Sequence, residues 1–353
     1  MATRSVQFGK HCVADFGPAG SGAMLTPLTD SSALLAASDW GGLQAALRRD
    51  GYLFLPGALP TAHVEAARDH VLGTFVEKGG ILDASQPVKE GVLKERCGLG
   101  CVPFMEGRNE VTHSEPLLQV FEGERIKEIF AGVLGAGTRS FDFKWLRAMP
   151  HDAFTGAHMD NVYMGRGSPK LLTCWVPFGE NPVEMGSLAV CEGSHNLAEF
   201  EKLRATYGQM DHESDKLDGS GWFTENPAEV LKLFGGQWKT ADFKAGDLLT
   251  FTMHTMHMST TNVTNKVRIS ADIRFQPADE PIDTRYCGDL KQFLAEMTVA
   301  GAWSAAEDEV GGEDSTNTEL AQKLEAAKEE EKVTIGQLRE KWGYPLAEGV
   351  ELK

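Results

Sequence analysis

The chain has 353 residues, 42% of them hydrophobic, with 34 lysine and arginine residues against 51 aspartate and glutamate residues. This length predicts one or two domains with a substantial core. The formal net charge of -17 argues against nucleic acid or an anionic membrane as the main partner, because both bind clustered positive charge.

Two further features of the sequence predict the location of the protein. No apolar run approaches the roughly 20 residues that cross a bilayer, and the first residues lack the apolar stretch of a secretory signal. The six cysteines form no C-x-x-C pair, so neither a zinc ribbon nor a disulfide framework is indicated. We therefore expect a cytoplasmic protein with reduced, mostly buried thiols. The sequence does not indicate its oligomeric state.

The first part of the chain is predicted to be mainly helical. Residues 1–40 are rich in Gly, Ala, Ser and Thr and carry little periodicity, so we expect them to be loosely ordered. Residues 51–57 read as a short apolar strand that ends in a Pro-Gly turn. Apolar spacing predicts helices over residues 43–49, over 61–78 with Thr61 as the cap, and over 123–134.

From Ser140 the pattern changes to short apolar runs separated by Gly, Pro and Asn turns, which is typical of strands. The predicted strands cover residues 141–149, 171–178, 187–191, 247–253 and 267–276. This order favours a mainly β fold of the α+β class, in which helices flank an antiparallel core.

Two segments are set apart from this core. Residues 196–239 form a long insertion between core strands, and such insertions often serve as a lid over a functional site. Residues 301–353 are acidic, with helices predicted over 318–332 and over 335–342, the second capped by Thr334. We expect this appendage to be solvated rather than to form an oligomer contact.

Two short motifs about a hundred residues apart indicate a metal site. His158-Met159-Asp160 places a histidine and a carboxylate two residues apart, so in extended structure both point to one face. His257 and Ser259 have the same spacing on a later predicted strand. Two histidines and one carboxylate leave other metal positions open, which is the arrangement of non-haem Fe(II) oxygenases.

Arg268 follows His257 by eleven positions. After the polar turn at residues 260–266 we expect it on the neighbouring strand, with Ser270, Asp272 and Arg274 on the same face. A guanidinium fork there would bind the carboxylate of a 2-oxoacid. Arg274 is the next candidate for this role.

Three other histidines compete for the metal site. His113 also belongs to an H-x-E pattern, but it lies in a polar stretch before the strand-rich region. His254 would face away from the metal if residues 247–259 formed one strand, because it lies three residues from His257. His195 is interpreted as a turn histidine that bonds to the backbone.

Together these motifs resemble the phytanoyl-CoA dioxygenase family of Fe(II)/2-oxoglutarate-dependent oxygenases. The segments that carry the resemblance are Ala157-His158-Met159-Asp160, Cys174-Trp175-Val176-Pro177, Gly186-Ser187-Leu188-Ala189-Val190, Glu192-Gly193-Ser194-His195, Gly246-Asp247, and His257-Met258-Ser259 followed by Arg268. Their order and spacing match the family over residues 51–276, within an expected dioxygenase domain spanning residues 41–300.

The resemblance implies a double-stranded β-helix core, a jelly-roll of the cupin type. It implies His158, Asp160 and His257 as iron ligands. It also implies that Arg268 and Ser259 bind the far carboxylate of 2-oxoglutarate, and it suggests that Trp175 lines the co-substrate pocket.

The resemblance further implies a dioxygenase that uses Fe(II), 2-oxoglutarate and dioxygen and releases succinate and carbon dioxide. In related halogenases a small residue replaces the metal-binding carboxylate so that halide can bind the iron. Asp160 is present here, so hydroxylation of a small molecule is favoured over halogenation.

The identity of the substrate and of the metal stays open. No basic cluster suited to the phosphates of coenzyme A is visible, so phytanoyl-CoA is not carried over as the substrate. Two alternatives are a non-catalytic jelly-roll protein with a structural metal and a zinc-dependent enzyme of the cupin type, because ligands alone do not identify a metal.

Overall fold

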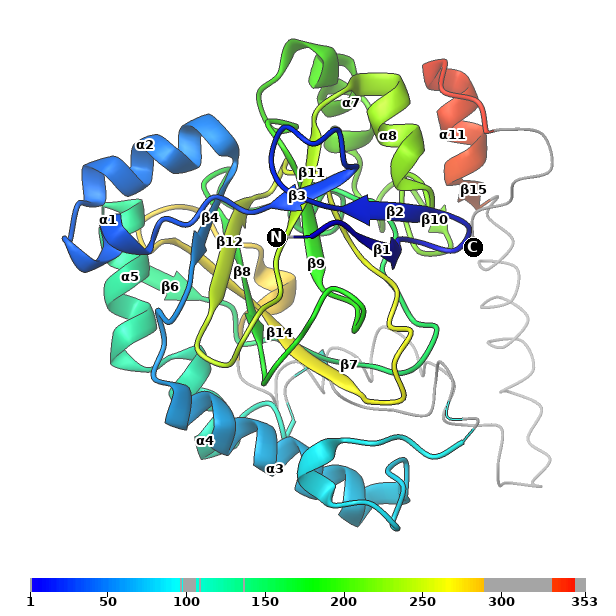
Figure 1. The fold of residues 1–353 in the computed structure, drawn as a ribbon. Helices are drawn as coiled ribbons and strands as arrows, with labels where there is room; N and C mark the ends of the chain where they lie inside the picture. The colour runs from blue at the N-terminus through cyan, green and yellow to red at the C-terminus, as the bar shows by residue number, and fades with distance from the viewer. Residues whose placement is uncertain are drawn as a thin grey trace, which may run out of the picture.

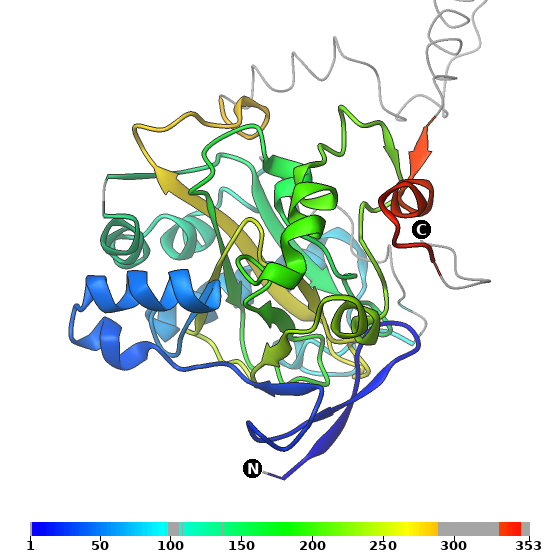
Figure 2. The same ribbon diagram turned by 90° about the horizontal axis from the view of Figure 1, so that it is seen from above.

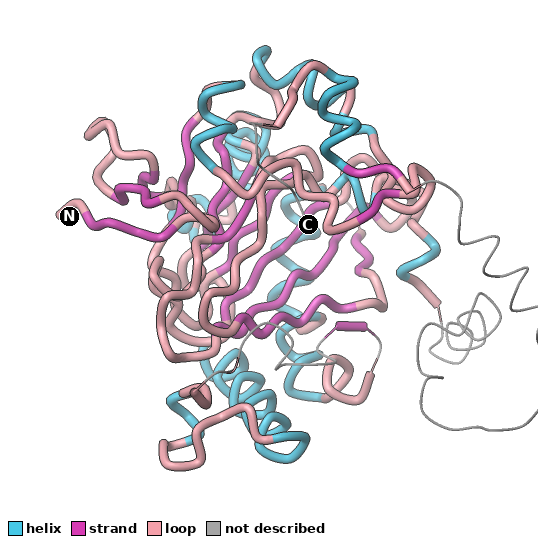
Figure 3. Tube along the Cα trace, turned by 90° about the vertical axis from the view of Figure 1, so that its right-hand side faces the viewer, coloured by secondary structure: helices cyan, strands magenta, loops and turns pink. Residues whose placement is uncertain are grey.

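The structure is a computed structural model that describes residues 2–95, 97, 106–107, 109–135, 137–288 and 332–346. Two β-sheets lie at the centre of the molecule and the helices lie around them (Figures 1 and 3). No helix of the described residues has the length and hydropathy that a membrane span requires.

The larger sheet has seven strands joined by antiparallel pairings, and β14 is its longest strand. The order is β4 (Tyr52–Leu55), β12 (Leu248–Thr252), β8 (Leu172–Pro177), β14 (Arg268–Pro277), β7 (Lys144–Met149) and β5 (Glu106–Gly107), with β6 (Thr138–Ser140) also paired to β14. The predicted strands after Ser140 that belong to this sheet overlap β7, β8, β12 and β14, so these predictions are confirmed.

The smaller sheet has six strands and includes the N-terminal segment. Its order is β1 (Arg4–Gln7), β2 (Val13–Phe16), β3 (Leu25–Pro27), β11 (Gln237–Thr240), β9 (Leu188–Glu192) and β13 (His257–Ser259). Figure 2 shows β1 and β2 at the outer edge of the molecule. The expectation that residues 1–40 are loosely ordered is therefore wrong.

The N-terminal strands are held by alternate apolar side chains. Ala14 and Phe16 of β2 are buried, and Phe8 meets the ring of Trp238 edge-on, with 5.3 Å between ring centroids. The glycines and serines that obscure this alternation in the sequence lie mostly in the intervening turns.

The two sheets face each other and share a core. One cluster of buried residues contains Trp175 of β8 and Leu249 of β12 together with Val190 of β9, so side chains of both sheets meet between them. The fold is the predicted mainly β jelly-roll core with flanking helices.

Helices cover the outer face of the larger sheet. Ile269, Ala271 and Ile273 of β14 pack in one cluster with apolar residues of these helices, and Phe130 stacks on Phe275 with ring centroids 4.1 Å apart. The helices are α1 (Ser32–Ala36), α2 (Trp40–Asp50), α3 (Thr61–Gly79), α4 (Glu115–Phe121) and α5 (Glu124–Leu134). Because the odd-numbered residues of this part of β14 face the helices, the even-numbered ones face the space between the sheets.

The predicted helices over 43–49, 61–78 and 123–134 correspond to α2, α3 and α5 and are confirmed. The predicted cap at Thr61 is wrong. Thr61 is the first residue of α3, the preceding Pro60 occupies the cap position, and no side chain caps this end.

The insertion over residues 196–239 packs into a core that it shares with the smaller sheet. It contains the 3-10 helices η2 (Ala198–Phe200) and η3 (Tyr207–Gln209), helices α7 (Glu201–Ala205) and α8 (Pro227–Phe234), and strand β10 (Leu217–Asp218). Phe200, Tyr207, Phe223 and Phe234 are buried in one apolar cluster. Its movement as a lid stays a prediction.

The C-terminal helix α11 (Ile335–Trp342) docks against this insertion, as Figure 1 shows. Arg339 has an exposed fraction of 0%; it donates to the carbonyl of Phe223 and lies 2.6 Å from a carboxylate oxygen of Glu229. For residues 332–346 the expectation of a solvated appendage is therefore wrong, because an apolar face and a buried ion pair fix this helix.

Two predictions about the C-terminal segment have different outcomes. The cap at Thr334 is confirmed, since its side chain accepts from the backbone N–H of Gln337 in a reciprocal capping box. The helix predicted over residues 318–332 lies outside the described residues, apart from Lys332. The remaining described elements are η1 (Val88–Glu90), α6 (Asn161–Met164), η4 (Thr284–Tyr286) and β15 (Val333–Thr334), the last paired with β10.

Candidate metal centre

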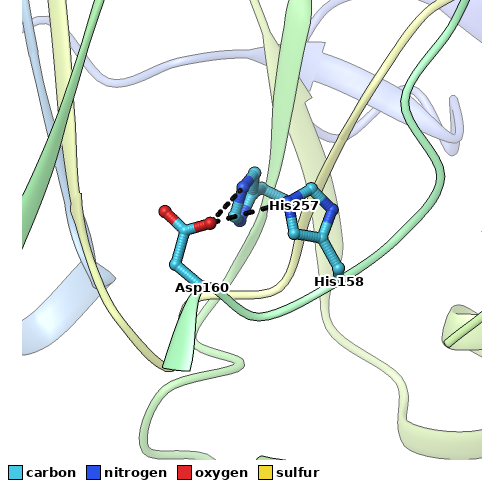
Figure 4. A group of neighbouring side chains, drawn as sticks. All are labelled: His158, Asp160 and His257. Carbon is cyan, nitrogen blue, oxygen red and sulfur yellow. Dashed lines mark ion pairs between the residues drawn. The ribbon is translucent and has the colours of Figure 1, made fainter. Parts of the chain in front are cut away.

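The structure brings His158, Asp160 and His257 together (Figure 4). His158 and His257 face each other across a backbone bridge, in which each N–H donates to the other residue's carbonyl at 2.9 and 3.0 Å. Asp160 directly precedes α6, so the chain turns there and brings the carboxylate back to the histidines. One potential ligand atom from each residue lies within 4.8 Å of the other two, and all three residues are buried.

Both histidines are oriented through their Nδ1 atoms. Nδ1 of His158 lies 2.8 Å from the carbonyl oxygen of Gly156, and Nδ1 of His257 lies 3.0 Å from that of Thr255. Because a carbonyl only accepts, each Nδ1 carries the proton and each Nε2 presents a lone pair. Each Nε2 lies 3.6 Å from Oδ1 of Asp160.

The charge states suit a divalent metal. Burial and the neighbouring His158 lower the pKa of His257 to about 4, so its imidazole is neutral near pH 7. Burial alone would raise the pKa of Asp160, but the positive charge of Arg274 is the main effect that outweighs burial, and that pKa lies well below its usual range. Neutral imidazoles and an ionised carboxylate are the protonation states that bind a metal. The residues therefore fit the metal that their pattern implies.

The second oxygen of Asp160 is held by the protein. Oδ2 accepts a hydrogen bond from the hydroxyl of Thr173 and lies 3.2 Å from Nη2 of Arg274. The sequence analysis missed Thr173, and it considered Arg274 only as the second candidate to bind the carboxylate of a 2-oxoacid. Thr173 and Arg274 lie opposite each other in the register of β8 and β14, and only strand pairing reveals that relation.

Arg268 is a buried cation without a carboxylate partner. It is 2% exposed, its Nη1 donates to the hydroxyl of Ser270, and its guanidinium carbon lies 5.9 Å from the ring centroid of Trp175. Its Nε is buried and has no hydrogen-bond partner, and within the described part of the chain no carboxylate forms an ion pair with it. Burial lowers its pKa to about 10, so it stays charged near pH 7.

Arg268 does not lie on a strand next to His257, so that prediction is wrong. β13 pairs with β9 in the smaller sheet, whereas β14 lies between β8 and β7 in the larger one. Residues 260–266 cross between the sheets instead of closing a hairpin. Ser270, Asp272 and Arg274 were predicted to share a face with Arg268, and their contacts agree with this. Ser270 accepts a hydrogen bond from Arg268. Asp272 accepts from Arg147, and Arg274 pairs with Asp160.

The other predicted co-substrate residues are also buried. The hydroxyl oxygen of Ser259 accepts from the backbone N–H of Thr155 at 2.8 Å. Trp175 is packed against Phe243, with ring centroids 4.8 Å apart, and its ring lies beside the Arg268 guanidinium. Their roles in binding 2-oxoglutarate stay predictions.

The competing histidines lie outside this cluster. Among the described His, Cys, Asp and Glu residues, only His158, Asp160 and His257 form a group of metal-binding geometry. His195 lies 3.0 Å from the carbonyl of Arg48, which confirms its interpretation as a backbone-bonded turn histidine. His254 is set apart by a turn between β12 and β13, so the idea of one strand over residues 247–259 is wrong.

The insertion reaches the candidate site through the backbone. Ala157, next to His158, exchanges hydrogen bonds with the insertion: its N–H donates to Thr224 and its carbonyl accepts from Phe223. Trp222 lies against Gly156, where an added Cβ would be 2.5 Å from the indole ring. The insertion is therefore bound directly to the segment that carries His158.

Solved structures that match this chain include two non-heme alpha-ketoglutarate-dependent enzymes. The epimerase SnoN from nogalamycin biosynthesis is 19% identical, covering 79% of this chain and 97% of that chain at a TM-score of 0.47. The carbocyclase SnoK from the same biosynthesis is 19% identical, covering 77% and 93% at 0.48. EctD from S. alaskensis is 19% identical, covering 83% and 90% at 0.48. No curated protein sequence matches significantly.

The sequence model of the phytanoyl-CoA dioxygenase (PhyH) family matches residues 47–270. This range contains both histidines, the aspartate and Arg268. Members of the family use Fe(II), 2-oxoglutarate and dioxygen. Since the match spans well over half of the chain, the protein belongs to the phytanoyl-CoA dioxygenase family.

Proposed function

We propose that the protein is an Fe(II)- and 2-oxoglutarate-dependent dioxygenase that hydroxylates a small-molecule metabolite and releases succinate and carbon dioxide. In this proposal His158, Asp160 and His257 hold the iron. Arg268 binds the far carboxylate of 2-oxoglutarate, with Ser259 and Trp175 at the same pocket.

The proposal rests mainly on one observation, which is that Arg268 is buried without an ion-pair partner among the described residues. A buried charge without a counter-ion is unfavourable, so buried charges are normally paired. Arg268 has a buried Nε without a hydrogen-bond partner and forms no ion pair within the described chain, and Asp272, whose charge acts on it, is itself paired with Arg147. A dicarboxylate co-substrate would supply the missing anion, whereas a protein with a purely structural metal would have no use for such a cation.

The protein's own residues hold the candidate metal ligands in place and bury them away from water. The carbonyls of Gly156 and Thr255 orient the two imidazoles, and Thr173 and Arg274 hold the carboxylate. The iron and the co-substrate, when bound, supply the oxidising chemistry. Asp160 occupies the position at which related halogenases bind halide, and this favours hydroxylation.

Two further observations bear on the substrate class and the cellular location. The net charge of -17 favours a small-molecule substrate over nucleic acid. The buried thiols of Cys174 and Cys191 agree with the reducing environment of the cytoplasm.

The proposal is tested by 2-oxoglutarate binding to the metal-loaded protein without oxygen. We expect binding by the Fe(II)-loaded wild type and much weaker binding by Arg268→Lys. Succinate release would then be measured with fractions of a metabolite extract to find the substrate. A folded, Fe(II)-loaded protein that does not bind 2-oxoglutarate would exclude the proposal; activity with zinc alone would favour a zinc-dependent cupin-type enzyme.

A further inference from the structure

The two oxygens of Asp160 have different neighbours. Oδ1 lies 3.6 Å from Nε2 of each histidine. Oδ2 accepts a hydrogen bond from the Thr173 hydroxyl and lies 3.2 Å from Nη2 of Arg274. One oxygen is thus available to a metal, and the other is occupied by the protein.

Arg274 is held in one orientation by three different groups. Its Nη2 lies 3.2 Å from Asp160, its Nε donates to the sulfur of Met164 at 3.0 Å, and its guanidinium carbon lies 4.7 Å from the ring centroid of Trp145. It is 3% exposed, so it cannot swing out to solvent. A side chain fixed in this way imposes its own position on the carboxylate that it contacts.

We propose that Arg274 is a positioning residue that, together with Thr173, fixes the orientation of the Asp160 carboxylate and so points Oδ1 toward the two histidines. This inference rests on the metal site of the proposed function, but not on the binding of 2-oxoglutarate. The residues lie on facing positions of two paired strands, so the arrangement is built into the larger sheet.

The orientation of this carboxylate matters because Asp160 is the acidic member of the candidate metal site. If Oδ2 were released, the carboxylate could rotate and Oδ1 would leave its position 3.6 Å from both Nε2 atoms. Arg274 and Thr173 prevent that rotation by holding Oδ2.

The test measures Co(II) binding, because cobalt's visible spectrum reports its coordination without any turnover. In Arg274→Met, which removes the guanidinium, we expect Co(II) affinity to fall by about 10–100-fold, the usual effect of losing a partner of a ligand. We also expect the visible bands to change as the carboxylate turns. Circular dichroism verifies that the variant is folded.

Arg339→Met is the matched control. Arg339 is as fully buried as Arg274, and its Nη2 lies 2.6 Å from Glu229, a carboxylate that is not a candidate ligand. We expect this variant to keep the Co(II) affinity and spectrum of the wild type. Equal changes in both variants would mean that any lost charge disturbs the site, and would overturn the inference.

Thr173→Val is the second variant, because it leaves both buried charges in place. We expect a smaller loss of Co(II) affinity and a change in the same bands, and a non-additive effect when it is combined with Arg274→Met, since both residues bind one oxygen. Wild-type affinity and spectrum in folded Arg274→Met, or in Thr173→Val if the former does not fold, would overturn the inference.

The outcome separates this inference from the proposed function. If the wild type binds Co(II) but never 2-oxoglutarate, the dioxygenase proposal fails and the role of Arg274 is still decided by the cobalt data. If 2-oxoglutarate binds and Arg274→Met leaves cobalt unchanged, only the positioning role fails.

Discussion

Strand β14 (Arg268–Pro277) carries one arginine at its first residue and a second, Arg274, toward its other end, in similar surroundings but paired in opposite ways. Arg268 and Arg274 are 2% and 3% exposed, and each guanidinium lies over a tryptophan ring. They share one face of the strand and stand six residues, roughly 20 Å, apart. Each has one buried guanidinium nitrogen without a hydrogen-bond partner, but Arg274 has Asp160 as its counter-ion, whereas Arg268 forms no ion pair in the described chain.

This comparison teaches that burial and residue type do not separate a structural arginine from a ligand-binding one. The counter-ion does. An arginine whose charge is matched within the protein can position other groups, whereas an unmatched one is prepared for an anion from outside. The following predictions test whether the two ends of β14 act in these separate ways.

The largest effect is expected from Asp160→Ala, which breaks the pairing at the Arg274 end. Turnover should be lost with the metal ligand. The metal-free variant should also lose about 3–5 kcal/mol of unfolding free energy, because Arg274 remains buried without an anion. Denaturant unfolding of the metal-free protein measures this loss.

His158→Ala is the control for Asp160→Ala. It also removes a candidate ligand, but it leaves no unpaired buried charge, so its stability loss should be smaller. Added chloride should recover stability in Asp160→Ala more than in His158→Ala. Equal stability losses in the two variants would contradict the pairing of Arg274 with Asp160.

The pH dependence of stability is the next largest effect. His257 takes up its proton near pH 4 in the folded protein but near pH 6.5 when unfolded. Between these values the unfolded state binds more protons, so acidification destabilises the metal-free fold. From pH 7 to pH 5 we expect a loss of about 2 kcal/mol attributable to this group.

Denaturant unfolding of wild type and His257→Gln at both pH values isolates the contribution of His257. The variant should lose this part of the dependence. At the other end of β14, burial still leaves the pKa of Arg268 at about 10, so that end should not respond in this range. An identical pH response in both proteins would contradict the neutral state of His257.

Arg268→Lys tests the unpaired end of β14. Lysine keeps a positive charge but loses the planar fork that matches a carboxylate. We expect the apparent KM for 2-oxoglutarate to rise about tenfold, or about 1.4 kcal/mol, with Co(II) affinity unchanged. A loss of metal affinity would mean that the two ends of β14 are not independent.

The smallest effect is expected from Gly221→Ala in the insertion. Gly221 has a φ of +75°, and an added Cβ would lie 3.0 Å from the hydroxyl of Tyr163, whose ring meets that of His158 edge-on. We expect about 1 kcal/mol of backbone strain and altered substrate turnover, with both metal and 2-oxoglutarate binding retained.

Gly20→Ala is the matched control for the insertion. Gly20 has a φ of +78°, and an added Cβ there would meet nothing within 4 Å. The same backbone strain should appear without any change in turnover. If both variants affect turnover equally, the insertion does not act on the site through Tyr163.

The sequence by itself determined the local features of this protein. Periodicity located helices α2, α3 and α5 and the strands after Ser140 to within a few residues. The alternation along β14 also indicated which side chains share a face. These properties depend on backbone geometry over a few residues, so a short stretch of sequence contains them.

Only the tertiary structure decided which strands face each other and what lies between them. It placed Arg268 and His257 on opposite sheets, set Thr173 and Arg274 on one oxygen of Asp160, and docked α11 through Arg339. These contacts join residues far apart in the chain. They depend on how two sheets close over a shared core, and no local pattern encodes that closure.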